Sequence, residues 1–390
     1  MVDTARQMER TRSAAGGGLA PELGLSVAVS SGPAALAAYR VFAAGRTTAP
    51  AQQARWTELW AEHVNPDVIV ATVSLDGEPL LAWPLEVIRD RLVTVARPCG
   101  GRHANGNFPA MAPLAGNLVD RAALANAFLQ GVAAARPDID LILLERLEPQ
   151  IEDLANPFIL PSSTPSPNIA LACDLSAGFE ETLLRHSGKR KRKKHRNHAR
   201  KFEEQGVIET GLARTPEEIR HYLDAFFAMK AIRFAELGIR DVFAEAEIRA
   251  FFHALFAGAP DRFVVHYLKV GGVVRAVTGS SLCGDRMVCE FSGFVPDETE
   301  NTSPGDYLFF ENIAWACGEG LAVHDFSVGD EPYKRLWCDI ETVQQDTVLT
   351  LSAKGRMAAA LHRWAADAKR RLKANPALWT AAKALRRRIR

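Results

Sequence analysis

The chain has 390 residues and a formal net charge of +1, and 47% of its residues are hydrophobic and 24% charged. This composition is typical of globular domains and excludes collagen-like, low-complexity and wholly disordered proteins. No apolar run approaches the ~20 residues that a membrane-spanning helix needs, which excludes a transmembrane protein.

The N-terminal segment and the cysteines bear on the cellular compartment. Residues 1–32 are polar and rich in Gly and Ala, without the apolar core of a secretory signal peptide. The six cysteines contain no Cys-x-x-Cys pair, and the histidines show no metal-ligand spacing. We therefore expect a cytoplasmic protein with a disordered tail over 1–32, no disulfide framework and no metal.

The next segment, 33–160, reads as a first domain. It opens with an amphipathic helix over 51–63. Asp76-Gly77 then supplies the positive φ angles that a tight turn between two strands needs, which predicts a β-hairpin. A third strand over 91–96, a Gly/Asn-rich loop over 98–109, a helix over 121–135 and a strand over 140–147 complete the predicted domain.

The prolines and serines of 161–167 predict a linker, and 168–355 reads as a second domain. Its predicted elements are a long helix from Ser176 to Gly206, helices over 215–237 and 243–257, an antiparallel meander over 262–294, a helix over 304–318 and a strand over 321–327. A basic C-terminal helix follows over 356–390. Because the order strands, helix, strand occurs twice, we predict an α/β (α+β) fold built from two similar halves.

Charge is unevenly distributed along the chain. Residues 189–201 hold nine Lys and Arg without an acidic residue, and so do residues 369–390. Subtracting these 18 cations leaves −17 for the remainder. Such segregation favours a polyanionic partner, namely phosphate, nucleic acid or an anionic lipid surface, although two solvated helix faces are an alternative.

The start of the helix predicted over 304–318 is clearly marked. Ser303 is placed to cap it, Pro304 suits its first position, and Asp306 completes a Ser-x-x-Asp pattern. A helix start that follows a strand offers backbone N–H groups to an anion such as a pyrophosphate. Such starts are common in α/β proteins, however, and the Asp306 carboxylate already occupies this turn. The chain also lacks a glycine-rich nucleotide loop.

Two strings around this helix resemble a known family. They are N-T-S-P-G-D-Y-L, at the helix start, and G-L-A-V-H-D-F-S-V-G-D-E-P-Y-K-R-L-W, after it. They resemble the C-terminal motif of the CelD/BcsL family, acyltransferase-like proteins of the GNAT superfamily associated with cellulose and exopolysaccharide synthesis. The matching residues are Ser303-Pro304-Gly305, Asp325-Phe326, Gly329 and Tyr333-Lys334. The resemblance covers roughly 50–355 and is specific over 300–338.

The resemblance implies two tandem GNAT-like domains, each with a mixed, mostly antiparallel sheet and flanking helices, in a plan similar to the Fem aminoacyltransferases. In GNAT enzymes two parallel strands splay apart and the acyl-CoA pantetheine inserts between them. The superfamily's Gln/Arg-x-x-Gly-x-Gly/Ala pyrophosphate loop is absent, and Ser303, Pro304, Gly305 and Asp306 stand in its place as the expected cofactor-binding residues. Fem-type relatives also lack the loop and use aminoacyl-tRNA, so the donor is either acyl-CoA or aminoacyl-tRNA.

Two carboxylates lie within predicted strands of the second domain. Glu290 stands between Cys289 and Phe291, so strand alternation turns it away from their shared apolar face. Near the splay it could act as the general base for an attacking hydroxyl or amine, or it could be a surface or ion-paired residue. Asp325 stands in an otherwise apolar strand, as a base, as the residue that orients Lys334, or as a structural partner of a nearby N–H.

Further candidates follow the Gly-Asp-Glu-Pro turn or stand elsewhere in polar segments. Tyr333 could protonate a leaving thiolate, and Lys334 could neutralise a developing oxyanion or hold a phosphate. The expected substrate-binding residues are Arg233, then His103, Asn105 and Asn107 in the Gly/Asn-rich loop, and Lys191, Arg192 and Arg196 in the basic run. Each has a structural alternative: an ordinary ion pair, a turn cap or a solvated helix face.

The basic segments suggest where the protein acts. If 189–201 lines the cleft between the halves, it would attract a nucleotide-sugar, a lipid pyrophosphate or a tRNA. The C-terminal helix carries apolar residues among its cations, including Trp364, Leu372 and Trp379, a pattern that suits peripheral contact with an anionic membrane. The protein would then be cytoplasmic, at the inner face of the membrane.

Three hypotheses follow from the sequence. The first is a GNAT-type acyltransferase that uses acyl-CoA to modify an amine or hydroxyl of a saccharide or similar polar acceptor in polysaccharide or cell-envelope biosynthesis. The second is a Fem-like aminoacyl-tRNA-dependent transferase, in which the basic helix holds tRNA. The third is a catalytically silent, membrane-associated binding or scaffold protein.

Overall fold

The computed structural model describes residues 24–113, 120–295 and 302–374. Residues 1–23 of the expected tail lie outside the described residues, but the expectation is wrong for its end. Residues Leu25–Ser31 form strand β1, and helix α1 begins at Gly32. The alternation of Leu25, Val27 and Val29 lets β1 pair with the next strand along its whole length.

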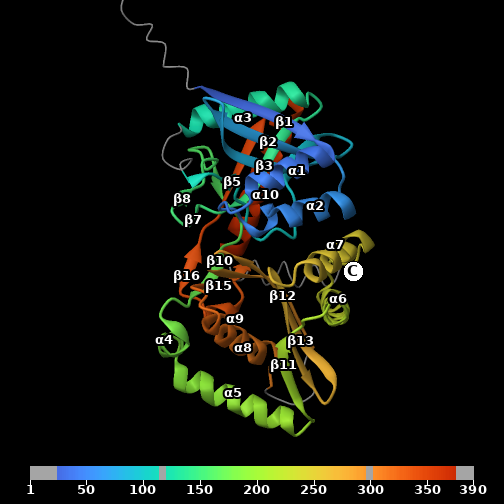
Figure 1. The fold of residues 1–390 in the computed structure, drawn as a ribbon, viewed down its shortest axis with the longest axis vertical. Coiled ribbons are helices and arrows are strands. Elements are labelled where there is room, and N and C mark those ends of the chain that lie inside the picture. The colour runs from blue at the N-terminus through green and yellow to red at the C-terminus, as the bar shows by residue number, and fades with distance from the viewer. Residues whose placement is uncertain (1–23, 114–119, 296–301, 375–390) are drawn as a thin grey trace, which may run out of the picture.

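The first half follows the predicted order of strands, helix and strand (Figure 1). Its elements are β1 (Leu25–Ser31), α1 (Gly32–Ala43), α2 (Ala54–His63), β2 (Val68–Leu75), β3 (Glu78–Arg89), β4 (Thr94–Pro98), α3 (Arg121–Ala135) and β6 (Leu141–Leu147). The Asp76-Gly77 turn joins β2 and β3 as predicted, and both residues have positive φ angles. Strand β6 returns parallel to β4 through α3.

The second half repeats this order element by element. It contains β11 (Ile208–Leu212), α6 (Pro216–Leu237), α7 (Ala246–Gly258), β12 (Phe263–Val270), β13 (Val273–Cys283), β14 (Arg286–Phe294), α8 (Pro304–Gly318) and β15 (Val323–Val328). The two sheets run β1-β2-β3-β4-β6-β17-β9 and β11-β12-β13-β14-β15-β10-β16, with most pairs antiparallel. The predicted α/β class with two similar halves is therefore confirmed.

The first sheet takes one strand from the far end of the chain. β10 (Ala170–Asp174) pairs with β15 in the second sheet, whereas β17 (Gln345–Thr350) pairs with β6 in the first. β17 also pairs with β9 (Thr164–Pro165), which lies inside the expected linker. The expected boundary of the second domain at 355 therefore needs correction, because β17 completes the first sheet.

The basic run forms its own helix. Helices α4 (Gly178–Arg185) and α5 (Gly188–Glu203) are separated at Ser187, whose φ of 62° is left-handed. A single helix from Ser176 to Gly206 was therefore a wrong prediction. α5 lies against α8 at the end of the molecule remote from the first half (Figure 1).

The remaining elements are short or lie near the C-terminus. They are a 3-10 helix (Pro50–Gln52), β5 (Ala110–Met111), β7 (Gln150–Ile151), β8 (Leu154–Ala155), α9 (Pro332–Arg335), β16 (Ile340–Thr342) and α10 (Ala353–Ala374). The expected C-terminal helix thus begins at Ala353, and its residues 375–390 lie outside the described part. No helix in the described ranges combines the length and apolarity needed to cross a membrane.

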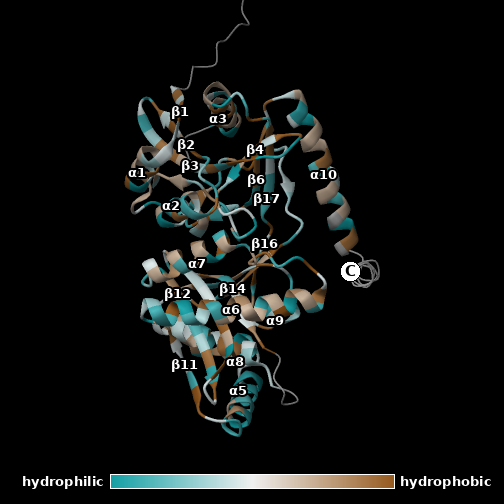
Figure 2. Ribbon diagram, turned by 90° about the vertical axis from the view of Figure 1, so that its right-hand side faces the viewer, coloured by the Kyte–Doolittle hydropathy of each residue, from teal (hydrophilic) through white to brown (hydrophobic). Residues whose placement is uncertain are grey.

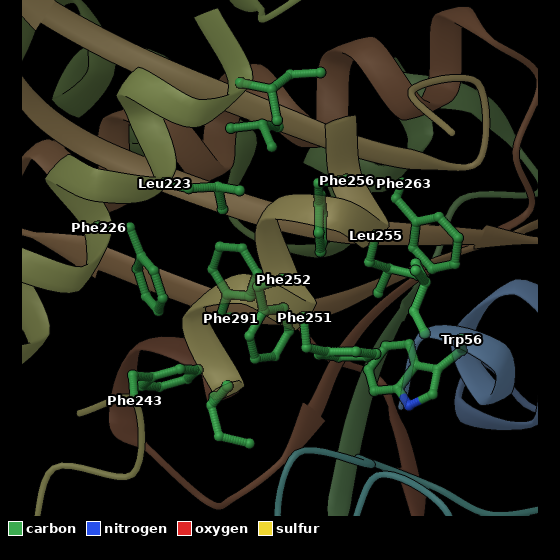
Figure 3. Close-up of a cluster of buried hydrophobic side chains, with 14 of the residues drawn as sticks. Trp56, Leu223, Phe226, Phe243, Phe251, Phe252, Leu255, Phe256, Phe263 and Phe291 are labelled. Carbon is green, nitrogen blue, oxygen red and sulfur yellow. The ribbon is translucent and has the colours of Figure 1, made fainter. Parts of the chain in front are cut away.

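An aromatic core joins the two halves (Figure 3). Trp56 of α2 lies edge-on to Phe251 of α7, with ring centroids 5.2 Å apart, and Trp60 contacts the same ring at 5.1 Å. Phe291 of β14 extends this cluster to Phe252. Because aromatic side chains bury large apolar areas, this contact holds the halves in a fixed relation.

Candidate functional site

Two neighbouring parallel strands part within the second sheet. β14 and β15 pair in parallel only where Arg286–Val288 faces Val323–Asp325. Beyond that point β14 continues to Phe294 without pairing to β15, so the strands splay as the resemblance implied. The Ser327 hydroxyl, which donates to the Cys289 carbonyl at 2.5 Å, joins the strands at the start of the opening.

Glu290 occupies a β-bulge beside this opening. Gly279 of β13 pairs with Phe291 whereas the next residue, Ser280, pairs with Cys289, so Glu290 is an extra residue on β14. Cys289 consequently packs with α8, while Phe291 packs on the opposite side in the aromatic core. The expectation that these two residues share one face is wrong, because the bulge reverses the alternation.

The Glu290 carboxylate faces the first half of the molecule. It accepts hydrogen bonds from the Ser281 hydroxyl at 2.7 Å and from the Asn105 side-chain amide at 2.8 Å. Asn105 also donates to the Glu290 carbonyl at 3.2 Å. Burial raises the pKa of Glu290 to about 7, although both hydrogen bonds favour the ionised form. An exposed or ion-paired surface position is therefore not what the structure shows.

A second carboxylate near the site was not singled out from the sequence. Glu148 follows β6 and accepts a hydrogen bond from the Gln344 amide at 2.5 Å, and Gln344 also donates to the Asn105 carbonyl at 2.9 Å. Burial and the charge of Asp325 raise the pKa of Glu148 to about 7. The sequence signal that could have identified Glu148 is its position as a charged residue directly after a buried strand.

Asp325 and Lys334 do not form the expected pair. The buried Asp325 carboxylate contacts the Arg286 guanidinium at 2.8 Å and accepts from the backbone N–H of Ser327 at 2.7 Å. Lys334 instead donates to the carbonyl of Ser327 at 3.2 Å and to that of Val328 at 3.0 Å. Asp325 thus matches the structural alternative raised for it, and the Lys334 ammonium stabilises the end of β15.

Tyr333 lies on the α8 side of the second sheet. Its ring stacks on Phe309, with centroids 5.5 Å apart. Burial raises the pKa of the Tyr333 hydroxyl above its usual value of 10. The tyrosine therefore keeps its proton at neutral pH, as a proton donor must.

A small cavity and a larger groove lie between the halves. The cavity, of about 40 Å³, is lined by Glu148, Arg286 and Asp325 together with Asn105. The groove, of about 1240 Å³, shares Thr48, Ile151, Cys283 and Arg286 with the cavity lining. Arg40, Arg46, Arg55 and Arg262 also line it, alongside Glu58, Glu152, Asp261 and Asp285. A polar molecule in the groove therefore meets both signs of charge.

A separate pocket of about 270 Å³ lies between α5 and α8. Asp306 lines it, and its carboxylate pairs with the Lys194 ammonium at 2.9 Å, which offsets the negative charge at the helix start. The Lys191 ammonium lies 3.4 Å from the centre of the Trp337 ring, and burial lowers the pKa of Lys191 to about 8. The predicted cap is present, because Ser303 accepts from the Asp306 N–H at 3.3 Å.

Several predicted site residues lie elsewhere. His103 is packed among Trp60, Phe243 and Phe252, and burial lowers its pKa to about 4. Arg233 is exposed and pairs with Glu236 at 3.0 Å. Asn107 accepts from Gln52 and donates to the Glu145 carbonyl, which is a structural role. On α5, Arg192 pairs with Glu180 and Arg196 is exposed.

One cluster has metal-ligating side chains. Single ligand atoms of Cys173, His186 and Asp339 lie within 4.8 Å of one another. The Asp339 carboxylate already contacts the Arg185 guanidinium at 3.2 Å and His186 at 3.3 Å. Burial raises the pKa of the Cys173 thiol, which favours the protonated form. These contacts account for the cluster without a bound ion.

Comparisons with known proteins agree with this geometry. Residues 189–335 match the family model described as an acetyltransferase (GNAT) domain. The structure of FemX is similar at a TM-score of 0.56 and 10% identity, over 85% of this chain and 99% of that one. That of L-PGS from Bacillus licheniformis is similar at 0.51 and 13%, over 84% and 95%. No curated protein sequence matches the chain significantly.

These likenesses to solved structures concern the fold, which spans both halves. The family match covers the segment from α5 through the splayed strands to α9 and therefore includes Glu290 and the pocket between α5 and α8. The second half of the chain thus contains a segment, residues 189–335, that matches an acetyltransferase (GNAT) domain.

Proposed function

We propose that the chain transfers an acyl group from acyl-CoA to an amine or hydroxyl of a saccharide or similar polar acceptor, in exopolysaccharide or cell-envelope biosynthesis as the CelD/BcsL resemblance implies. The observation that supports this proposal most is the position of Glu290. Its carboxylate lies on a β-bulge where two parallel strands part, and it has a pKa of about 7. A base with that pKa is both available and effective near neutral pH.

As a general base, Glu290 would be oriented by its two hydrogen bonds. Ser281 and Asn105 hold its two oxygens, and Asn105 brings this contact from the first half of the molecule. The carboxylate accepts the proton of the acceptor hydroxyl or amine as that atom bonds to the acyl carbon. The thiolate of the donor departs as that bond forms and takes its proton from solvent, because burial makes Tyr333 a weaker acid than a thiol.

The groove between the halves suits a saccharide acceptor. Its volume of about 1240 Å³ exceeds the ~300–1000 Å³ of ordinary small-molecule sites. Arginines and carboxylates line it from both halves, and paired polar groups of this kind bind sugar hydroxyls. The cavity beside Glu148 and Arg286 adjoins it and would receive the reacting end.

The pocket between α5 and α8 suits the phosphates of the donor. GNAT domains generally use acetyl-CoA. Arg190, Lys191 and Lys194 supply positive charge, and the buried indole N–H of Trp337 has no hydrogen-bond partner among the described residues. A phosphate oxygen would satisfy that N–H, and the aromatic lining would contact a base. When bound, the donor supplies the activated acyl group.

The test is acyl transfer from acetyl-CoA to a panel of amino sugars and oligosaccharides. We expect Glu290→Gln to lower the rate by about 10²–10⁴-fold while acetyl-CoA affinity, measured by calorimetry, stays unchanged. Glu236→Gln, at an exposed glutamate on α6, is the matched control and should keep the wild-type rate. Full activity in Glu290→Gln would overturn the assignment of the base.

The Fem-like alternative has one specific observation in its favour. The fold resembles that of FemX over almost all of the FemX chain, and α5 presents many cations. Replacing Lys193, Arg196 and Arg200, which are exposed on α5, by Gln would then abolish binding of aminoacyl-tRNA. Under the acyl-CoA proposal the same variant keeps its affinity for acetyl-CoA. A scaffold protein would tolerate Glu290→Gln without any phenotype.

A further inference from the structure

Helix α10 lies along the outside of the first half, with one face fixed by packing (Figure 2). Gly355 and Ala359 form that inner face. A Cβ at Gly355 would lie 1.9 Å from the Asp140 carbonyl, and Ala359 is fully buried. Further along the same face, Arg370 donates to the Pro165 carbonyl. The opposite face of α10 is therefore turned to solvent.

Large apolar side chains occupy that outer face. Met357 is 66% exposed, Leu361 64% and Trp364 71%. Their spacing of four and three residues puts them in one row along the helix. Single exposed apolar side chains are common on proteins, whereas a row of three, including a tryptophan, indicates a surface that contacts something apolar.

The charges beside this row have one sign. Lys354, Arg356, Arg363 and Arg371 are exposed on α10. The one carboxylate of the helix, Asp367, lies toward the inner face and pairs with Arg370. A cationic face with an apolar row is the pattern of a helix that lies in the surface of an anionic bilayer.

We propose that the outer face of α10, through Met357, Leu361 and Trp364, binds an anionic lipid bilayer. The apolar row enters the headgroup–acyl boundary, and the flanking cations contact lipid phosphates. A second copy of the chain fits this face less well. A symmetric dimer would bring the exposed arginines of two such helices together without a carboxylate to pair them.

This proposal does not depend on the acyl-transfer proposal. It also places the membrane contact on a different segment from the two that the sequence predicted. That expectation included 189–201 and 369–390. Some cations of α5 line a pocket or pair with Asp306 and Glu180, whereas Lys193, Arg196 and Arg200 are exposed. The contact surface on α10 starts about three turns before residue 369, where the helix already presents its apolar row.

Co-sedimentation with vesicles tests the proposal. We expect the full chain to bind vesicles with about 30% phosphatidylglycerol, and to bind pure phosphatidylcholine at least about tenfold more weakly. The double variant Leu361→Glu/Trp364→Glu should lose binding by about tenfold or more, with its thermal unfolding unchanged. Leu92→Glu, at a residue 78% exposed in the β3–β4 turn, is the matched control and should bind as the wild type.

Three outcomes would overturn it. They are no binding to anionic vesicles at low salt, equal binding to both vesicle types, and unchanged binding of the double variant. Light scattering tests directly whether a second copy of the chain binds the outer face of α10. A concentration-dependent dimer that the double variant dissociates would assign the face to self-association instead.

Discussion

The two parallel strand pairs of the molecule have the same place in the fold but different surroundings. In the first half, β4 pairs with β6 only at Val95 and Ala96. Beyond this pairing, the loop that follows β4 lies beside β6 and bonds to it. Asn107 of that loop forms a parallel bridge to Leu147, donates to the Arg146 carbonyl at 2.8 Å and accepts from Glu148 at 3.0 Å. The first splay is therefore filled by the protein's own chain.

In the second half, called the open half below, β14 and β15 part after the pairing of Arg286–Val288 with Val323–Asp325. β14 also carries the bulge at Glu290, whereas β4 pairs with β3 without a register shift. The closed half contributes the loop that delivers Asn105, and the open half contributes the carboxylate that Asn105 contacts. The same fold thus supplies a supporting loop in the first half and the candidate reaction site in the second half.

The largest expected effect concerns the carboxylate of the open half. If Glu290 is the base, it must be ionised, so kcat/KM should fall as the pH drops below about 7 and level off above it. In Glu290→Gln this pH dependence should disappear from the residual activity. A wild-type rate that is flat between pH 5.5 and 8.5 would contradict the assignment.

Two asparagines of one loop have different roles. Asn105 contacts Glu290, whereas Asn107 bridges to Leu147 of β6. Asn105→Ala removes a donor that favours the ionised Glu290, so the pKa of Glu290 and the acidic limb of the pH–rate profile should move upward, with a rate loss of about tenfold at pH 7. Asn107→Ala should lower the free energy of unfolding by about 1–3 kcal/mol and leave that limb in place. Identical pH profiles for the two variants would rule out the distinction.

Donor binding should depend on the open half alone. Lys191→Ala removes a cation from the pocket between α5 and α8, and we expect acetyl-CoA affinity to fall about fivefold, with the loss shrinking at high salt. Arg233→Ala, at an exposed cation that pairs with Glu236, is the control and should bind normally. Equal affinities of all three proteins would exclude this pocket as the donor site.

The last effect concerns stability. The pKa of Glu148 is raised from 4.5 to about 7, so the fold favours its protonated form and loses stability as the pH rises between these values. Glu148→Gln lacks this titration. Relative to wild type it should gain about 1–2 kcal/mol in free energy of unfolding between pH 5 and pH 8, as measured with urea. A constant difference across that range would show that burial of Glu148 does not destabilise the fold.

Much of the fold could be predicted from local sequence patterns. The Asp-Gly turn, the Ser303 cap and the strand–helix–strand crossover each depend on a few neighbouring residues, and the structure has all three. The bulge at Glu290 was not predictable, because a shift in register depends on the partner strand and leaves the sequence alternation intact. Glu148 approaches the site only because the two halves pack together, which is a long-range contact. The break at Ser187 had a local signal that the prediction missed, because Gly188 follows it and glycine disfavours a helix interior.

The position of β17 in the first sheet has a consequence for synthesis of the chain. β6 lies next to β17, whose residues 345–350 are translated after every other strand of the two sheets, so the first sheet cannot close while the ribosome is still making the second half. The second sheet, in turn, uses β10, which precedes all of its other strands in the sequence. A nascent chain therefore carries an open sheet edge at β6 until β17 emerges. A cut at the linker would leave the first half without β17, which only the second fragment carries, so the two fragments would need to be made together.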